Sequence, residues 1–229
     1  ALTLACLWSF HKSEHVAVPS RWILAGCVLA ILSTFTRTAG LPLVLAVGAW
    51  LGLARHWRAL AGFVIAFAAP NLLWWLRSRA GGEAQYVSEF WMIDPYQPDL
   101  GQAGIGDLVA RMLENFQGYV LVHIPAGLSP WSGGALTALG LVVMAAALAG
   151  WVARIRVRWT VVELFTPLYF GLILLWPAVW SGDRFALPLY PLMLFYASEA
   201  LVRGAKRIDA RLPVAAGVIA VAALLVPSM

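Results

Sequence analysis

This chain contains a series of long apolar runs, each interrupted by a charged residue, a glycine or a proline. Backbone polar groups inside a bilayer have to be hydrogen-bonded within their own segment, so runs of this kind predict membrane helices. A shorter run, Ala1 to Phe10, comes first and predicts the end of a further helix. The seven full runs lie at about residues 22–36, 39–54, 59–76, 133–153, 160–180, 185–202 and 212–227.

Composition supports the same class of protein. Hydrophobic residues make up 62% of the chain and charged residues only 12%, about half the share found in soluble domains. We therefore predict an all-α integral membrane protein: one polytopic helical bundle over residues 1–229, with about seven full spans and a partial one at the N-terminus. The chain starts inside an apolar run without an initiator Met, so we expect a fragment that lacks an N-terminal half.

The basic residues predict the topology. If the predicted spans alternate in direction, 11 of the 16 Lys and Arg fall on one side, which the positive-inside rule makes cytoplasmic. The net charge of +5 lies in short loops between spans, so it indicates orientation and not a nucleic-acid partner. Arg greatly outnumbers Lys and Ala is abundant, which suggests a bacterial source. We predict a multi-pass protein of the inner membrane.

One connection, at about residues 77–130, is much longer than the others and lies on the predicted external, periplasmic side. Its aromatic content argues against disorder. Leu108, Met112, Phe116 and Tyr119 recur at helical spacing after Asp107, a residue that often caps helices. We expect an amphipathic helix lying in the outer membrane interface. Gly81-Gly82 and Asp94 to Pro98 predict turns.

Two arginines occupy unusual positions. Arg184, beside Asp183, stands in a short gap between two apolar runs, and Arg37 stands in the tight connection Thr36 to Gly40. A guanidinium at a membrane edge needs a partner, which can be a carboxylate, helix-end carbonyls or a phosphate. Arg184 is equally consistent with an interfacial anchor, and Arg37 with an arginine bound to carbonyls of its own hairpin.

The segments Ser33-Thr-Phe-Thr-Arg-Thr-Ala-Gly-Leu41 and Asp183-Arg-Phe-Ala-Leu-Pro-Leu-Tyr-Pro191, together with the basic turn Arg55 to Arg58, resemble the C-terminal half of GT-C membrane glycosyltransferases. The similarity is to the branch of protein O-mannosyltransferases, aminoarabinose transferases and RgtA/B/C/D-like enzymes. It implies transfer of a sugar from a polyprenyl-phosphate carrier to a glycan, lipid or protein acceptor outside the membrane.

The resemblance also implies an acidic catalytic base in an external loop that would precede Ala1, so no catalytic residue is assigned here. Arg37 and Arg184 are the predicted ligands of the donor phosphate, because fixed guanidinium groups stabilise negative charge on a departing phosphate. Asp183 is expected to orient Arg184. Neither Asp94 nor Asp183 matches the family's base.

Weaker substrate-contact candidates lie in the external loop. They are Tyr86, Glu89, Trp91, Asp94 and His123, with Trp131 as a second aromatic platform for a sugar. Each of them can instead be a solvent-exposed residue of the membrane interface without a role in substrate binding. His123 can be a structural histidine. No cofactor or metal ligand is assigned, although external carboxylates leave open a divalent metal site assembled on folding. Cys6 and Cys27 are expected to be packing residues.

Two other functions stay open from the sequence. A transporter or flippase of a lipid-linked substrate would place charge at the bilayer midplane in broken helices, whereas the charged residues here lie in loops or near span ends. A non-catalytic membrane scaffold would use Arg37 and Arg184 as anchors and the long loop as a docking surface.

Overall fold

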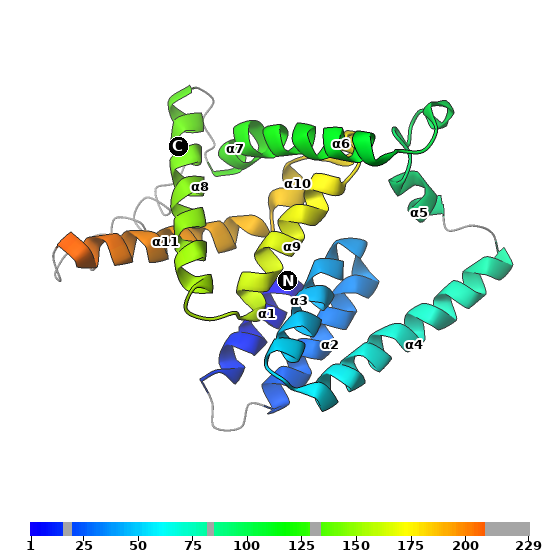
Figure 1. Ribbon diagram of the computed structural model, residues 1–229, viewed down its shortest axis with the longest axis horizontal. Coiled ribbons are helices and arrows are strands. Elements are labelled where there is room, and N and C mark those ends of the chain that lie inside the picture. Colours follow the sequence, from blue (N-terminus) through cyan, green and yellow to red (C-terminus); the bar gives the residue numbers. More distant parts are fainter. Residues whose placement is uncertain (16–19, 82–84, 129–133, 209–229) are drawn as a thin grey trace. The chain divides into compact units, whose positions relative to one another are not determined.

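The computed structural model describes residues 1–15, 20–81, 85–128 and 134–208, and every regular element in these ranges is a helix (Figure 1). The prediction of an all-α fold is confirmed there. The predicted run at 212–227 and Trp131 lie outside the described residues. The α-helices are α1 (Leu2–Ser13), α2 (Ser20–Thr36), α3 (Leu41–Leu53), α4 (Trp57–Gly81), α5 (Gln85–Phe90), α6 (Ile105–Gly118), α7 (Ile124–Leu128), α8 (Gly134–Ile155), α9 (Val161–Leu175), α10 (Asp183–Ala186) and α11 (Leu189–Ile208).

Short helical turns join several of these elements. A π-helical turn, η3 (Tyr119–His123), lies between α6 and α7. The 3-10 turns are η1 (Thr38–Gly40), η2 (Pro98–Leu100) and η4 (Ala178–Trp180).

The helices pack into two compact units whose segments alternate along the chain. Unit 1 comprises residues 1–112 and 159–180, and unit 2 comprises residues 113–158 and 181–229. The boundary falls within α6, after Met112. The predicted single membrane domain stays a prediction.

In unit 1, α2 packs against α1 and α3, and α9 packs along α3 (Figure 1). The core contains Phe10, Leu43, Val47 and Phe165, all buried. Cys6 and Cys27 are also buried and free, in agreement with the prediction that they are packing residues.

In unit 2, α8 crosses α11 and α7 packs on α8 (Figure 1). Tyr196 and Ile124 are almost fully buried in this unit. Near the end of α11, Glu199 lies 3.3 Å from the Arg203 guanidinium and 3.8 Å from that of Arg154. The Glu199 carboxylate is thus paired with one arginine of its own helix, α11, and with one arginine of α8.

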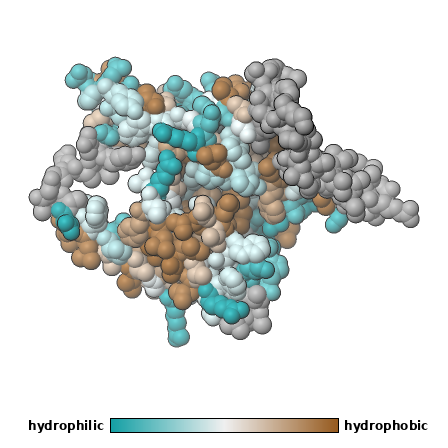
Figure 2. Space-filling view, turned by 180° about the vertical axis from the view of Figure 1, so that it is seen from behind, coloured by the Kyte–Doolittle hydropathy of each residue, from teal (hydrophilic) through white to brown (hydrophobic). Residues whose placement is uncertain are grey.

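Two helices in the described residues are long and apolar enough to cross a bilayer. They are Trp57–Arg77 of α4, with 21 residues, and Thr137–Ile155 of α8, with 19. Only 6% and 17% of their apolar windows are buried inside the protein, which differs from the core helix of a soluble domain. On the face drawn in Figure 2, hydrophobic residues gather in one area of the surface. These helices indicate association with a membrane.

The other predicted spans are shorter or interrupted. The run at 160–180 forms a helix of only 15 residues, α9, because Pro177 favours an extended conformation at the preceding residue, and Trp176 has φ −64° and ψ 142°. The run at 185–202 begins with the short α10 and forms a regular helix only from Leu189. Seven full spans are therefore not seen in the described residues.

The amphipathic helix expected in the long connection is present as α6. It begins at Ile105, two residues before the predicted cap. Asp107 does bond the helix start, since its Oδ2 accepts from the backbone N–H of Gly104 at 2.9 Å. Tyr119, just beyond α6, is buried, whereas Phe116 is exposed, so the apolar positions do not all share one buried face.

Candidate functional site

The π-helical turn at Tyr119–His123 widens the continuous helix formed by α6 and α7. The backbone N–H of Ile124 bonds the carbonyl of Tyr119, five residues back. Turns of this kind occur mostly as single insertions in α-helices, often at functional sites. Here the widened turn carries two aromatic polar side chains, Tyr119 and His123, on neighbouring positions of the helix surface, with ring centroids 5.2 Å apart.

Both side chains meet the start of α10 within unit 2. His123 Nδ1 lies 2.6 Å from Asp183 Oδ1. Because an ionised carboxylate only accepts hydrogen bonds, Nδ1 is the donor, and Nε2 is the nitrogen left to act on other groups. The side chain of Asp183 is 67% exposed and that of His123 28%, so the pair is open to solvent.

The backbone at Gly182 sets the direction of Asp183. Gly182 has φ 153° and ψ 179°, a region that is essentially restricted to glycine. The Tyr119 hydroxyl lies 3.5 Å from the carbonyl oxygen and 3.4 Å from the amide nitrogen of Gly182. The corner before α10 is thus held by a buried phenol.

Two further hydrogen bonds join the same segments. Ser181 Oγ donates to Asn115 Oδ1 at 2.9 Å, and the Tyr190 hydroxyl donates to the carbonyl of His123 at 3.0 Å. Burial raises the pKa of Tyr119, against the opposing effect of hydrogen bonds from Gly182 and Ser181. Tyr119 is therefore a neutral hydrogen-bonding group near pH 7.

Arg184 is exposed at the same corner. Its guanidinium carbon lies 5.2 Å from the centre of the Phe185 ring, and Phe185 is buried. The hydrogen-bond partner observed for Asp183 is His123, whereas the sequence pointed to Arg184. We define Tyr119, His123, Gly182, Asp183 and Arg184 as the α10 corner.

Arg37, the second predicted phosphate ligand, belongs to unit 1. It lies in the turn between α2 and α3 in an extended conformation, with φ −161° and ψ 136°, and its side chain is exposed. A side chain at Gly40 would place its Cβ 2.6 Å from the backbone of Ser33, so this glycine permits the predicted tight hairpin. A single phosphate bound by Arg37 and Arg184 stays a prediction, because the structure describes each unit by itself.

Four of the weaker candidates, Tyr86, Glu89, Trp91 and Asp94, lie in unit 1. Asp94 Oδ1 accepts from the backbone N–H of Tyr96 at 2.8 Å, which gives this carboxylate a role in the predicted turn. Trp91 is exposed and meets the ring of Phe90 edge-on. Glu89 is half-buried, and the side chain of Tyr86 lies outside the described residues.

Sequence reasoning gave Arg111 no role, yet its side chain organises the long connection. It is buried on the inner face of α6, with 6% exposure. Its guanidinium donates to the carbonyls of Phe90 at 3.0 Å, Leu175 and Ile93 at 3.4 Å each, and Met92. Burial lowers the pKa of Arg111, and the nearby Asp107 carboxylate opposes this shift.

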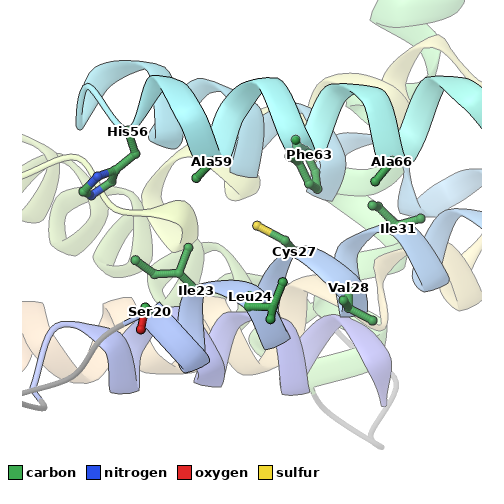
Figure 3. Close-up of a pocket in the computed structure, with 11 residues that line it drawn as sticks. Ser20, Ile23, Leu24, Cys27, Val28, Ile31, His56, Ala59, Phe63 and Ala66 are labelled. Carbon is green, nitrogen blue, oxygen red and sulfur yellow. The ribbon is translucent and has the colours of Figure 1, made fainter.

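An apolar groove of about 590 Å³ lies in unit 1 between α2 and α4. Figure 3 shows Cys27, Leu24 and Ile31 of α2 opposite Phe63 and other side chains of α4, with His56 at one end. A groove with this lining has room for a hydrocarbon chain, and its polar groups are few.

The external carboxylates considered as metal ligands do not form a cluster in the described residues. The group there whose side-chain ligand atoms lie within reach of one ion is His11, Glu14 and His15 at the end of α1.

Comparisons with known proteins return no family model, no curated protein and no solved structure that matches the chain.

Proposed function

We propose that this chain is part of a multi-pass glycosyltransferase of the bacterial inner membrane. In this proposal it carries the site for the phosphate and lipid of a polyprenyl-phosphate-linked sugar. The observation that carries the proposal is the α10 corner, where an imidazole hydrogen-bonded to a carboxylate lies beside an exposed arginine. This arrangement is suited to binding an anion and to donating or accepting a proton at the same site.

The roles follow from the chemistry of each group. Arg184 binds the donor phosphate, and Arg37, in unit 1, is the second phosphate ligand that the sequence resemblance predicts. Asp183 holds the ring of His123, whose Nε2 donates to a phosphate oxygen when the ring is protonated. The bond between the anomeric carbon and the phosphate oxygen breaks as the acceptor oxygen bonds the anomeric carbon. The acceptor proton goes to the acidic base that the family resemblance implies, and polyprenyl phosphate leaves.

The apolar groove between α2 and α4 supports a lipid-linked donor. Burying each methylene group contributes about 0.8 kcal/mol, so even part of a polyprenyl tail would add substantially to affinity. On the predicted topology, the long connection faces the periplasm and presents Trp91 to a sugar or acceptor.

The test uses the complete natural protein reconstituted with a polyprenyl-phosphate sugar. Arg184→Ala is expected to lower transfer about 10²- to 10³-fold, the usual effect of removing one fixed donor to a developing anion. Arg156→Ala is the matched control, because Arg156 is exposed in the same unit, in the turn just after the C-terminal end of α8. Unchanged transfer by the Arg37→Ala, Arg184→Ala double variant at equal membrane abundance would overturn the proposal.

The groove also favours a second candidate, a flippase of a lipid-linked substrate, which needs an apolar path and no chemistry. Proteoliposomes holding a labelled polyprenyl-phosphate sugar distinguish the two functions. A transferase produces glycosylated acceptor without moving donor between leaflets, whereas a flippase moves donor when no acceptor is present.

A further inference from the structure

We propose that His11, Glu14 and His15 form a binding site for a divalent transition-metal ion of the Zn²⁺ type. α1 ends at Ser13, and the turn after it, in which the backbone N–H groups of Glu14 and His15 bond the carbonyls of His11 and Lys12, brings the three side chains together at the C-terminal end of the helix. One ligand atom from each lies within 4.8 Å of the other two. The site belongs to unit 1 and is independent of the α10 corner.

The ligand types suit this class of ion. Imidazole nitrogen and carboxylate oxygen both bind Zn²⁺ at about 2.0–2.2 Å, so ligand atoms around a tetrahedral ion are separated by about 3.3 Å. The side chains are exposed, and modest rotations bring the atoms from their present separation to that distance. Three protein ligands leave a coordination position for water or another ligand.

A hydrogen bond already orients one of the ligands. His15 Nδ1 lies 2.8 Å from the backbone carbonyl of His11, and since a carbonyl only accepts, Nδ1 carries the proton. This fixes the tautomer in which Nε2 has the free lone pair, an arrangement that recurs in metal-binding histidines. The His11 and His15 ring centroids are 4.6 Å apart, so both rings lie on the side of the helix that the ion would occupy.

The helix end also favours a cation. The last carbonyls of α1 carry the negative end of the helix dipole, and the Glu14 carboxylate adds a full negative charge. The neighbouring cation, Lys12, has its ammonium 4.7 Å from the centre of the Trp8 ring. The site thus combines two neutral donors, one charge and a favourable local field.

The sequence signal of this site is the pattern His-x-x-Glu-His on a helix, at His11 to His15. Once the helix is known to continue to Ser13 with Glu14 still in a helical conformation, the three residues fall on one side.

The experiment measures Zn²⁺ binding to the 229-residue chain in lipid nanodiscs, free of any polyhistidine tag, by competition with a chromophoric chelator. Co²⁺ serves as a spectroscopic probe of tetrahedral ligation. The proposal predicts one ion per chain, with affinity at least about tenfold weaker in His15→Ala and in Glu14→Gln. His56→Ala is the matched control, since it removes an exposed histidine from the connection between α3 and α4 in the same unit and is expected to leave Zn²⁺ binding unchanged.

The three positions are exposed, so the variants are expected to fold normally, which thermal unfolding without metal verifies. Binding that is absent from the wild type, or that survives in the His11→Ala, His15→Ala double variant, would overturn the proposal. Loss of Co²⁺ absorption in both ligand variants but not in His56→Ala would support it.

Discussion

Arg111 in unit 1 and His123 in unit 2 both join segments that are distant in the sequence. They differ in how far their hydrogen-bonding groups remain available to a ligand. The Arg111 guanidinium is buried and donates to four backbone carbonyls. His123 makes its hydrogen bond to Asp183 through Nδ1 alone, and the Asp183 carboxylate is largely exposed. The comparison indicates that Arg111 stabilises the fold, whereas the α10 corner is available for a ligand.

The largest expected effect comes from removing the buried guanidinium. Arg111→Ala leaves four carbonyls without their charged donor, and we expect the free energy of unfolding in detergent to fall by about 3–5 kcal/mol. Arg111→Lys, which keeps the charge but lacks the planar fork, should lose less. Arg156→Ala, an exposed control, is expected to stay within about 0.5 kcal/mol. Equal stability of Arg111→Ala and the control would remove the structural role assigned to Arg111.

A smaller effect is expected at the glycine that shapes the α10 corner. Gly182 has φ 153°, so Gly182→Ala should cost about 1–3 kcal/mol through backbone strain. No atom lies within 4 Å of a Cβ built at Gly182, so any loss reflects conformation and not crowding. Gly171→Ala is the control: its added Cβ also meets no atom, it lies inside α9, and the change should be neutral or slightly stabilising. If the two variants have the same free energy of unfolding, the backbone conformation of Gly182 does not contribute to the stability of the α10 corner.

The smallest effect on stability is expected for Asp183→Asn. The Asp183 side chain is exposed, and the amide oxygen of asparagine can replace part of its hydrogen bond to His123. The free energy of unfolding should therefore change by less than about 0.5 kcal/mol. Sugar transfer should fall more strongly than stability, because the His123 imidazole loses the charged partner that orients it. A loss of stability comparable to that of Arg111→Ala would show that the α10 corner stabilises the fold as Arg111 does. The two regions would then not differ in role.

Sequence patterns located the helices well where an apolar run ended at a charge or a turn. The runs predicted at 22–36, 39–54 and 133–153 correspond to α2, to η1 with α3, and to α8. They failed to separate α10 from α11, since the apolar character continues through Phe185 and Ala186 while Pro188 interrupts the backbone between the helices. Run length alone also overestimated the spans, as the 15 residues of α9 show.

The candidate site was predicted only in part. Asp183 and Arg184 were singled out because charge between apolar runs is conspicuous, and His123 was named as a weaker candidate. Their grouping could not be predicted, because His123 and Asp183 are 60 residues apart and the π-helical turn that directs His123 has no simple sequence signature. The buried position of Arg111 was missed for a different reason: an arginine is normally assigned to the polar face of an amphipathic helix, and its carbonyl partners come from distant segments.

The proposed function requires the α10 corner to bind the phosphate of a lipid-linked donor. The most direct test is the affinity of the chain in nanodiscs for polyprenyl phosphate, with the uncharged polyprenol as reference and Arg156→Ala as control. We expect a preference for the phosphate that falls about 10- to 100-fold in Arg184→Ala, the value of a charge-assisted hydrogen bond, with polyprenol binding unchanged. Equal affinity for the two lipids, or a phosphate preference that Arg184→Ala leaves intact, would contradict it.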